Sequence, residues 1–453
     1  MPDTQNPEKG SVYRRFHEEI LKSPFVRVVC TAREVKHFAA LSVILFVLEK
    51  ELKKHEVLWS PPPLAQQGFF EVLIGDGYEV SRGAVISEVP KKVSPQALLL
   101  YSPSVATLLH ALCKELGYVS SETLWPICIC TAGSSGRELD AERVIKRRRA
   151  GREPAEEEEE TSRESEDFSD SDSAGGVTAQ HQDICAEIEK FRKFHGDKER
   201  LELKKEIYFP FCRWATLYGA LLNDLGVAKE LELFNPKKKR RACVLDGSEY
   251  VLNQFLAQIG ISVAAAQSAS LGTLTGQIGE FVRRSFRRRR VYVKHYEHNV
   301  EVTHIEAYFS ICSLIRRKKY VEAVFGLRDI KKLEIAEGMQ EHRRMVEQVK
   351  RGAGRKKIVR VHGAEVVYVP KDVLVFRTLN EISVIKEVFS GIRGVVRRRH
   401  PEKEVVVSAY AEEEETWVLV YGVEERIEHE KSGGSKVAES LRSIVKEKLM
   451  LRE

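Results

Sequence analysis

In the first 130 residues, short apolar runs of strand length alternate with longer segments of helical spacing. Continuous apolar runs at residues 25–30, 69–74 and 97–101 predict strands that are buried on both faces. The spacing at residues 12–22 predicts a short helix. Residues 38–52 are apolar nearly all round and predict a helix buried in the interior.

A further helix is predicted from its boundary residues. Ser102 is expected to cap it, with Pro103 at its first position and Gly117 just beyond its end. Between these boundaries apolar side chains recur at helical spacing, at Val105, Leu108, Leu109, Leu112 and Leu116. The alternation of strand and helix predicts an α/β fold with a mainly parallel sheet.

The middle and the tail of the chain have different patterns. Helical spacing extends over residues 206–225, 248–259, 271–286 and 302–315, and an alternating strand is expected at 291–296. The tail predicts strands at residues 358–361, 365–369, 373–376, 404–409 and 416–421, and a last helix at 435–449. This pattern indicates a second, smaller α/β or α+β domain that is separate from the first.

The net charge of the chain is divided unevenly along it. The 453 residues include 73 Lys and Arg and 67 Asp and Glu, which gives a net charge of +6. Residues 153–173 hold eleven acids and one arginine, a net charge of −10, which leaves +16 on the rest of the chain. This segment is rich in serine and poor in apolar residues, so it predicts a disordered insert.

From these changes in hydrophobic pattern and charge along the chain we predict five segments. They are an α/β lobe over residues 1–150, the acidic insert over 151–180, helices completing the first lobe and a linker over 181–243, a helical partner-interaction region over 244–326, and a C-terminal domain over 327–453.

Composition argues against a membrane or secreted protein. The longest apolar run, residues 38–48, has 11 residues, fewer than the roughly 20 that cross a bilayer. The first residues lack the apolar core of a secretory signal. The eight cysteines are scattered, which is typical of reduced intracellular thiols and not of a disulfide framework.

Catalytic residues of a parallel α/β sheet lie beyond the carboxyl ends of its strands. The first predicted strand is followed by Glu34 among basic residues, the second by Asp76 alone, and the third by no carboxylate or histidine. A two-metal phosphoesterase needs several Asp and His ligands that converge on its ions. We therefore interpret Glu34 and Asp76 as cap or turn residues, and predict no catalytic, metal or cofactor-binding site.

Other candidate metal ligands also lack the required spacing. Cys128 and Cys130 form one pair, whereas structural zinc needs two such pairs or histidine partners, so we interpret them as core thiols. Alternation along a strand places His295 and Glu297 on one face and His298 on the other. A solvated strand edge is favoured here over a metal site.

Basic clusters carry more information about function. They lie at residues 146–149, 237–241, 283–284, 287–290, 316–319 and 397–399. Each is dense enough to attract a phosphate backbone or an acidic protein surface, and a solvated surface is the alternative. The run of Lys237, Lys238, Lys239, Arg240 and Arg241 also matches a nuclear import signal. No aromatic residue is spaced to stack successive bases near these runs.

Several segments resemble a known family. They are residues 206–222 (EIYFPFCRWATLYGALL), 252–260 (LNQFLAQIG), 291–315, 124–127 (LWPI), 25–48 and 372–376 (DVLVF). In this order the chain resembles the family of the eukaryotic replication-initiation factor called cell division cycle protein forty-five. An acidic disordered insert in the first half is a further shared trait. The chain is shorter than typical members, its insert lies after Trp125, and residues 60–100 are compressed.

The resemblance implies a catalytically inactive relative of the RecJ-like DHH phosphoesterases. It implies a DHH-like α/β lobe, a helical middle region and a DHHA1-like C-terminal domain. Active relatives carry Asp-x-Asp after the first strand, where this chain has Val35, Lys36 and His37. The family protein joins the MCM hexamer and the GINS complex in the replicative CMG helicase. It works with the replicative polymerase and other fork proteins, and binds chromatin, replication origins and single-stranded DNA.

We therefore expect a non-enzymatic nuclear scaffold, a monomer within a hetero-oligomer, with no cofactor and no membrane contact. The alternatives are an active DHH-family single-strand exonuclease and a stand-alone nucleic-acid-binding protein. Partner contacts are expected at Phe211, Trp214, Tyr218, Phe281 and Phe286, with core packing as the alternative role for each. Contacts with nucleic acid or an acidic partner are expected at Arg283, Arg284, Arg287, Arg288, Arg316 and Arg317.

Overall fold

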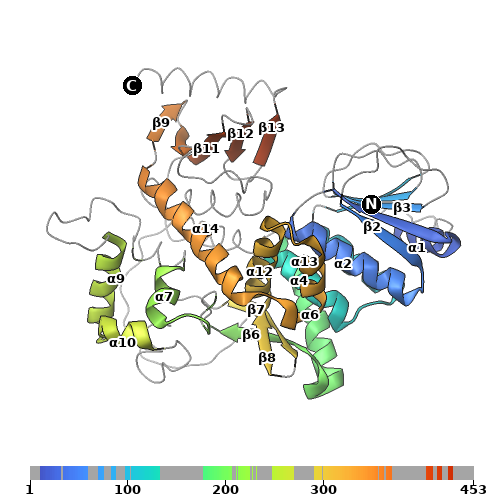
Figure 1. Cartoon of the computed structure of the whole chain (residues 1–453), viewed down its shortest axis with the longest axis horizontal. Helices are drawn as coiled ribbons and strands as arrows, with labels where there is room; N and C mark the ends of the chain where they lie inside the picture. The colour runs from blue at the N-terminus through green and yellow to red at the C-terminus, as the bar shows by residue number, and fades with distance from the viewer. Residues whose placement is uncertain are drawn as a thin grey trace, which may run out of the picture.

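The computed structural model places three sheets around a central group of helices among the residues that it describes (Figure 1). The structure describes residues 11–31, 34–59, 70–75, 83–87, 97–102, 104–132, 177–206, 211, 213–224, 227, 231, 247–269, 290–297, 299–355, 357–361, 364–369, 405–411, 416–420 and 427–431. The acidic insert up to residue 176, the helices predicted at 271–286 and 435–449 and the strand predicted at 373–376 lie outside these residues. Residues 177–180, predicted as the end of the disordered insert, are helical, so that boundary is wrong.

The apolar runs near the N-terminus form a parallel sheet. Its strands are β1 (Phe25–Cys30), β2 (Lys54–Leu58), β3 (Phe70–Ile74), β4 (Gly83–Ser87) and β5 (Leu98–Tyr101). They pair in parallel in the order β2-β1-β3-β4-β5. On β1, Val28 faces the main core, whereas Val29 packs with a smaller cluster on the other face. Because both faces are covered, the strands read as continuous apolar runs. The predicted α/β fold class is confirmed.

One charged row crosses this sheet. Arg27 of β1 lies in register with Glu56 of β2 and Glu71 of β3. Its Nε donates to Glu56 Oε1 at 2.5 Å and its Nη1 to Glu71 Oε1 at 3.4 Å. Arg27 and Glu71 are both buried. The pairing supplies the hydrogen bonds that a buried guanidinium needs, which is how a charge is accommodated inside an apolar strand.

Helices α1 (Val12–Lys22), α2 (Val35–Lys50), α3 (Val105–Leu116) and α4 (Ser121–Ala132) belong to this lobe. The predicted cap of α3 at Ser102 is wrong, since Ser104 is the N-cap residue. Strand β5 extends to Tyr101, so the chain needs two more residues before it turns into the helix. The predicted C-terminal glycine is confirmed, because Gly117 has a φ of 73°, which favours glycine.

Helix α4 contains the two neighbouring cysteines. Cys128 is buried and Cys130 half-buried, and both lie within the helix, so the core-thiol interpretation of Cys128 is confirmed. Burial raises the pKa of the Cys128 thiol well above its usual value. A thiol in this environment is protonated and unreactive.

The next described segment begins with α6 (Val177–His195), a short 3₁₀ turn η1 (Gly196–Lys198) and strand β6 (Leu201–Glu206). Strand β6 pairs antiparallel with β7 (Arg290–Glu297), and β7 pairs antiparallel with β8 (Val300–Thr303). Among the described residues of the helix predicted at 206–225, only α7 (Leu217–Leu222) is helical, so the prediction is wrong for the other described residues of that range. Thr216 caps α7 by accepting a hydrogen bond from the Gly219 N–H, so a local cap overrides the longer helical spacing.

Helix α12 (His304–Arg316) is the central element of the fold. Every residue from His304 to Ile315 is buried. A reciprocal capping box starts the helix: Glu306 N–H donates to Thr303 Oγ1 at 3.3 Å, and Thr303 N–H donates to Glu306 Oε2 at 2.9 Å. The box brings a fully buried carboxylate to the positive end of the helix dipole, where negative charge is stabilised.

Three elements follow α12, and the two helices among them pack against it. They are α13 (Tyr320–Arg328), the 3₁₀ turn η4 (Ile330–Lys332) and α14 (Ile335–Arg355). Helix α12 contacts α14, α13, α4 and α2. At Gly338 of α14, a Cβ atom would lie 2.5 Å from Ser310 Oγ and 2.7 Å from the Ser310 backbone nitrogen. The absence of a side chain at Gly338 therefore allows α12 and α14 to approach closely.

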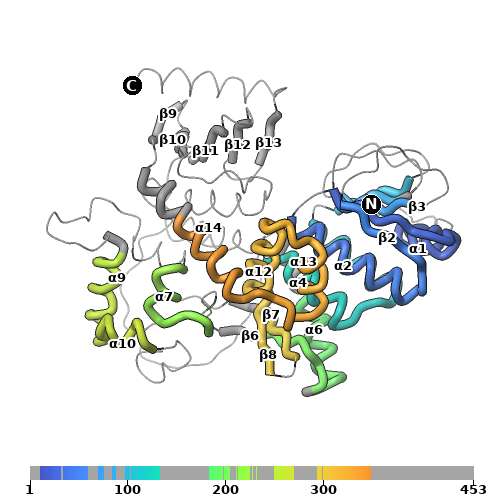
Figure 2. The backbone as a smooth tube through the Cα atoms, in the orientation of Figure 1, coloured from blue at the N-terminus to red at the C-terminus, as the bar shows by residue number. Residues whose placement is uncertain are grey.

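Helices α7, α9 (Gly247–Gln258) and α10 (Val263–Ser268) lie on the opposite side of α12 and α14 from α2, as Figure 2 shows. Gly260 follows α9 with a φ of 76°, a left-handed conformation that favours glycine at the end of a helix. No helix among the described residues is long and apolar enough to cross a membrane.

Beyond α14 the described strands form a mixed sheet. It contains β9 (Lys357–Val361), β10 (Ala364–Val369), β11 (Val405–Ala411), β12 (Thr416–Val420) and β13 (Ile427–Lys431). The order is β13-β12-β11-β10-β9, with β10 and β11 parallel and the other pairs antiparallel. Four of these strands were expected from the sequence, and β13 was not, because its Ile-Glu-His-Glu-Lys sequence is mostly charged.

We expect Gly338→Ala to lower the free energy of unfolding by about 1–3 kcal/mol, because the added methyl group forces α14 away from Ser310. The better helix propensity of alanine offsets part of this cost. Urea unfolding followed by circular dichroism measures the difference. Gln340→Ala, at an exposed position of the same helix, is the control and should change stability by less than about 0.5 kcal/mol. Equal stability of the two variants would contradict the close approach.

Candidate partner interface

The carboxyl ends of β1 and β3 lie at the edge where parallel α/β sheets usually place their functional residues. In this chain β1 ends at Cys30, which is buried, and burial raises the pKa of its thiol to about 12. Glu34 is the N-cap residue of α2, and Lys36 Nζ lies 3.3 Å from its Oε2. The cap interpretation of Glu34 is confirmed by position, and Asp76 lies outside the described residues. Within the described ranges no group of three or more His, Cys, Asp or Glu is arranged to hold a metal ion.

His295 does not lie on a solvated strand edge, so that interpretation is wrong. The residue is 5% exposed, and its ring packs against Trp125 of α4 with ring centroids 5.0 Å apart. Sheet β6-β7-β8 is covered on this face by α4, which period-2 alternation alone cannot indicate. Burial lowers the pKa of His295 to about 4. At neutral pH the side chain is therefore an uncharged part of the core.

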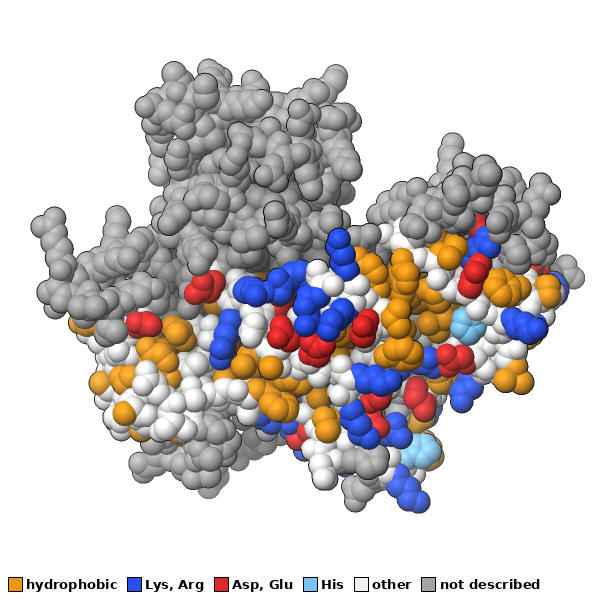
Figure 3. Space-filling view, in the orientation of Figure 1, with side chains coloured by type: hydrophobic (Ala, Val, Ile, Leu, Met, Phe, Trp, Pro, Cys, Tyr) orange, Lys and Arg blue, Asp and Glu red, His pale blue; other side chains and the backbone are white. Residues whose placement is uncertain are grey.

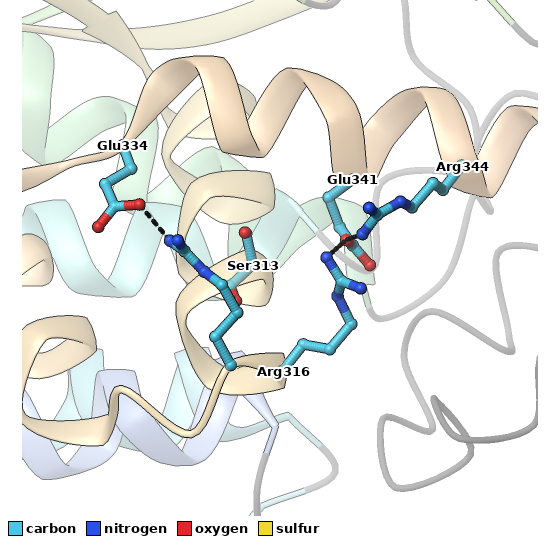
Figure 4. Close-up of polar contacts among 6 residues, drawn as sticks. Ser313, Arg316, Glu334, Glu341 and Arg344 are labelled. Atoms are coloured by element: carbon cyan, nitrogen blue, oxygen red, sulfur yellow. Dashed lines mark hydrogen bonds and ion pairs between the residues drawn. The ribbon is translucent and has the colours of Figure 1, made fainter.

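The basic run at the end of α12 lies on the surface and is held by acids. Arg316 Nη2 lies 2.7 Å from Glu341 Oε2, and Arg344 Nη1 lies 3.5 Å from the same oxygen. Glu341 is buried, so two arginines converge on one carboxylate that is shielded from water. Figure 4 shows Arg316 and Arg344 meeting Glu341 of α14.

A second cluster of the same kind lies beside the first. Arg317 forms an ion pair with Glu334, and Lys319 Nζ lies 3.2 Å from Glu334 Oε1. The Arg317 guanidinium, with Lys319 as a second donor, lowers the pKa of the Glu334 carboxyl group. We call these six residues the paired-cation surface: Arg316, Arg317, Lys319, Glu334, Glu341 and Arg344.

Cations outnumber acids on this surface. Each carboxylate is shared by two cations, so each cluster keeps a charge of +1. The exposed residues Lys318 and Arg343 add to this charge. In Figure 3, Lys and Arg side chains gather over α12 and α14 around a few acidic ones. Glu334, Glu341 and Arg344 were not identified from the sequence. The available signal in the sequence was the position of two glutamates seven residues apart, about two helical turns, at the start of α14.

The aromatic contacts expected near α7 have different environments. Phe211 is 1% exposed and packs against Phe309 and His342, so its expected role as an exposed contact is wrong. Its backbone has a φ of 59°, a conformation unusual for a non-glycine residue, which turns the ring into the core. Tyr218 is half-buried against the core. Trp214 is 48% exposed and is accessible to a partner.

The remaining predicted contacts lie outside the described residues. They are Phe281, Phe286, Arg283, Arg284, Arg287, Arg288 and the import run Lys237, Lys238, Lys239, Arg240 and Arg241. These stay predictions.

No protein-family model and no curated protein sequence matches this chain. Among solved structures, CDC45 from Entamoeba histolytica aligns with a TM-score of 0.59 over 90% of this chain and 87% of its own. The two sequences are 12% identical. This chain has the CDC45 fold.

RecJ from Thermus thermophilus, in complex with Mn²⁺, also aligns, with a TM-score of 0.38 and 11% identity over 90% of this chain and 46% of RecJ. The fold assignment rests on CDC45, because a TM-score of this size does not indicate a common fold. The family resemblance read from the sequence is thus confirmed at the level of the CDC45 fold.

Acidification is expected to destabilise this CDC45-like fold through His295. The pKa of His295 is about 4 in the folded chain and 6.5 in the unfolded chain. The contribution of His295 to the free energy of unfolding is therefore complete above pH 6.5 and is lost as the pH falls towards 4. The free energy of unfolding falls by about 3 kcal/mol at most. His295→Phe keeps a ring against Trp125 and should flatten the stability profile over this range. His195→Phe, at an exposed position of α6, should keep the wild-type slope. Identical slopes in all three proteins would contradict the assignment.

Arg316→Ala should lower the free energy of unfolding by about 1–2 kcal/mol, because it leaves the buried Glu341 without its 2.7 Å partner. Lys318→Ala removes an equal charge from the next turn and should change stability by less than about 0.5 kcal/mol. Thermal unfolding of both variants at neutral pH makes the comparison. An equal effect of the two substitutions would show that the Arg316–Glu341 pair is energetically neutral.

Proposed function

We propose that this chain is a non-enzymatic DNA replication factor that acts as a scaffold subunit, joining an MCM hexamer to a GINS complex in a replicative helicase. The observation that carries the proposal is the likeness to CDC45, which extends over nearly the whole of both chains. The ordered resemblance of the middle segments to the same family supports it independently of the structure. Nuclear localisation and binding to chromatin, origins, fork proteins and single-stranded DNA belong to the same proposal.

The described surface suits a scaffold. Several of its charged groups are held by ion pairs, and an exposed aromatic residue, Trp214, lies beside Arg213, which forms an ion pair with Glu301 at 2.8 Å. Aromatic and arginine side chains of this kind are the usual anchors of protein interfaces. Cys30 and Cys128, the thiols at the first strand end and in α4, are buried and protonated at neutral pH.

Co-expression of the full chain with MCM and GINS subunits from the same organism tests the proposal. We expect one complex on size-exclusion chromatography that contains all three components. Trp214→Ala should weaken association by about tenfold, as expected for an interface anchor. Phe194→Ala, at an exposed aromatic position of α6, is the matched control and should leave association unchanged. Stable failure of the wild-type chain to associate would overturn the scaffold role.

The two alternative functions predict different results in the same preparation. An active DHH-family exonuclease would release mononucleotides from labelled single-stranded DNA in the presence of Mn²⁺, and we expect none. A stand-alone nucleic-acid-binding protein would bind DNA tightly without partners, with affinity that falls steeply as salt increases.

A further inference from the structure

The paired-cation surface has an unusual balance of charge. Arg316 with Arg344, and Arg317 with Lys319, each share a single carboxylate. A one-to-one ion pair is neutral, whereas these clusters each retain one positive charge. The glutamates therefore fix the positions of the cations without neutralising them.

We propose that the paired-cation surface binds a phosphorylated segment of a protein partner, through phosphate monoesters on serine or threonine. This inference rests on the proposed scaffold role, because it names the chemistry of one contact that such a role requires. It assigns Arg344 and Lys319 to the same site as Arg316 and Arg317.

Charge favours a phosphate monoester over a carboxylate. A partner carboxylate carries the same single charge as Glu334 and Glu341, which already occupy the cations at short range. A phosphate monoester carries about −1.5 to −2 and has three acceptor oxygens. It can accept hydrogen bonds from two guanidinium groups while the glutamate stays in place.

The surroundings favour a protein over a nucleic acid. A phosphodiester carries a single charge, like a carboxylate, and single strands are usually held by bases stacked on exposed aromatic rings as well. On α12 and the described side chains of α14, the aromatic residues Tyr308 and Phe309 and the ring of His342 are buried. Their rings pack in the core, so this surface offers no stacking platform.

The spacing of the clusters sets the expected ligand. Glu334 directly precedes α14 and Glu341 lies within it, seven residues further on, which is about two helical turns or roughly 10 Å. An extended peptide covers this distance in about three residues. A segment with two phosphorylated residues separated by two others would therefore place one phosphate at each cluster.

Binding of synthetic peptides to the full chain tests this inference by fluorescence anisotropy at physiological salt. The probes are a peptide with two phosphoserines three positions apart and no other charged side chain, its unphosphorylated form and a short oligothymidylate. We expect the phosphorylated peptide to bind at least tenfold more tightly than the unphosphorylated one. Arg316→Gln with Arg317→Gln should reduce this preference to less than threefold. Lys22→Gln with Lys190→Gln removes the same charge from α1 and α6 and should keep the full preference.

A third variant separates recognition from a structural role. Glu334→Gln removes a competing carboxylate and should tighten phosphopeptide binding several-fold, whereas loss of a merely structural ion pair would not. It also provides the test if the double arginine variant unfolds early in a thermal melt.

Equal binding of the two peptides would overturn the inference. So would oligothymidylate binding that depends on Arg316 and Arg317 without any phosphopeptide preference, which would identify a nucleic-acid surface. If wild-type chain still associates with MCM and GINS in that case, the scaffold role is unaffected.

Discussion

The structure depends on the complete burial of α12. A helix surrounded on nearly all sides needs partners for its polar groups, and the Thr303–Glu306 capping box and Ser310, whose Oγ donates to the Glu306 carbonyl at 2.9 Å, supply some of them. Neighbouring elements must also approach α12 closely. Gly338 allows a close approach at Ser310, and Gly326 allows one at Ile311 and Leu333. Helices from distant parts of the sequence can pack on α12 because these two conditions are met together.

The same helix positions the surface that we propose as a binding site. Arg316 ends α12, Arg317 and Lys319 follow it, and the acids that fix them come from the start and first turns of α14. The arrangement of charges on the surface is therefore set by the packing underneath. A shift of α14 relative to α12 would separate Glu341 from Arg316 and change the spacing of the two cation clusters.

The sequence predicts much of the architecture because burial on both faces leaves a clear signal. The sequence predicts the bounds of β1, β3, β5 and α1 to within about one residue, from the apolar runs of the strands and the periodic pattern of the helix. Strand β2, with the sequence Lys-His-Glu-Val-Leu, was missed because it lies at the edge of its sheet and is only partly buried. Residues 206–225 have helical spacing in sequence, but pairing of β6 with β7 and the local cap at Thr216 decide the structure there.

The site was less predictable than the fold. Sequence identified Arg316 and Arg317 as a basic cluster, but their acidic partners come from another helix, and tertiary contacts of this kind leave no mark on local composition. The burial of His295 and Phe211 has the same origin. Trp125 covers the first, and a left-handed backbone turns the second inward. The burial of these two side chains cannot be predicted from the local sequence pattern alone.

The central position of α12 also has a consequence for synthesis of the chain on the ribosome. Helices α2 and α4 are complete by residue 132, but α12 and α13, which cover them, begin only at residue 304. At roughly 5–20 residues per second, the nascent chain waits about 10–35 s before these helices can be covered. During that interval α2, which is apolar on nearly every side, exposes surface that favours aggregation. The order of synthesis therefore leaves part of the apolar surface of the first lobe uncovered until the last third of the chain emerges.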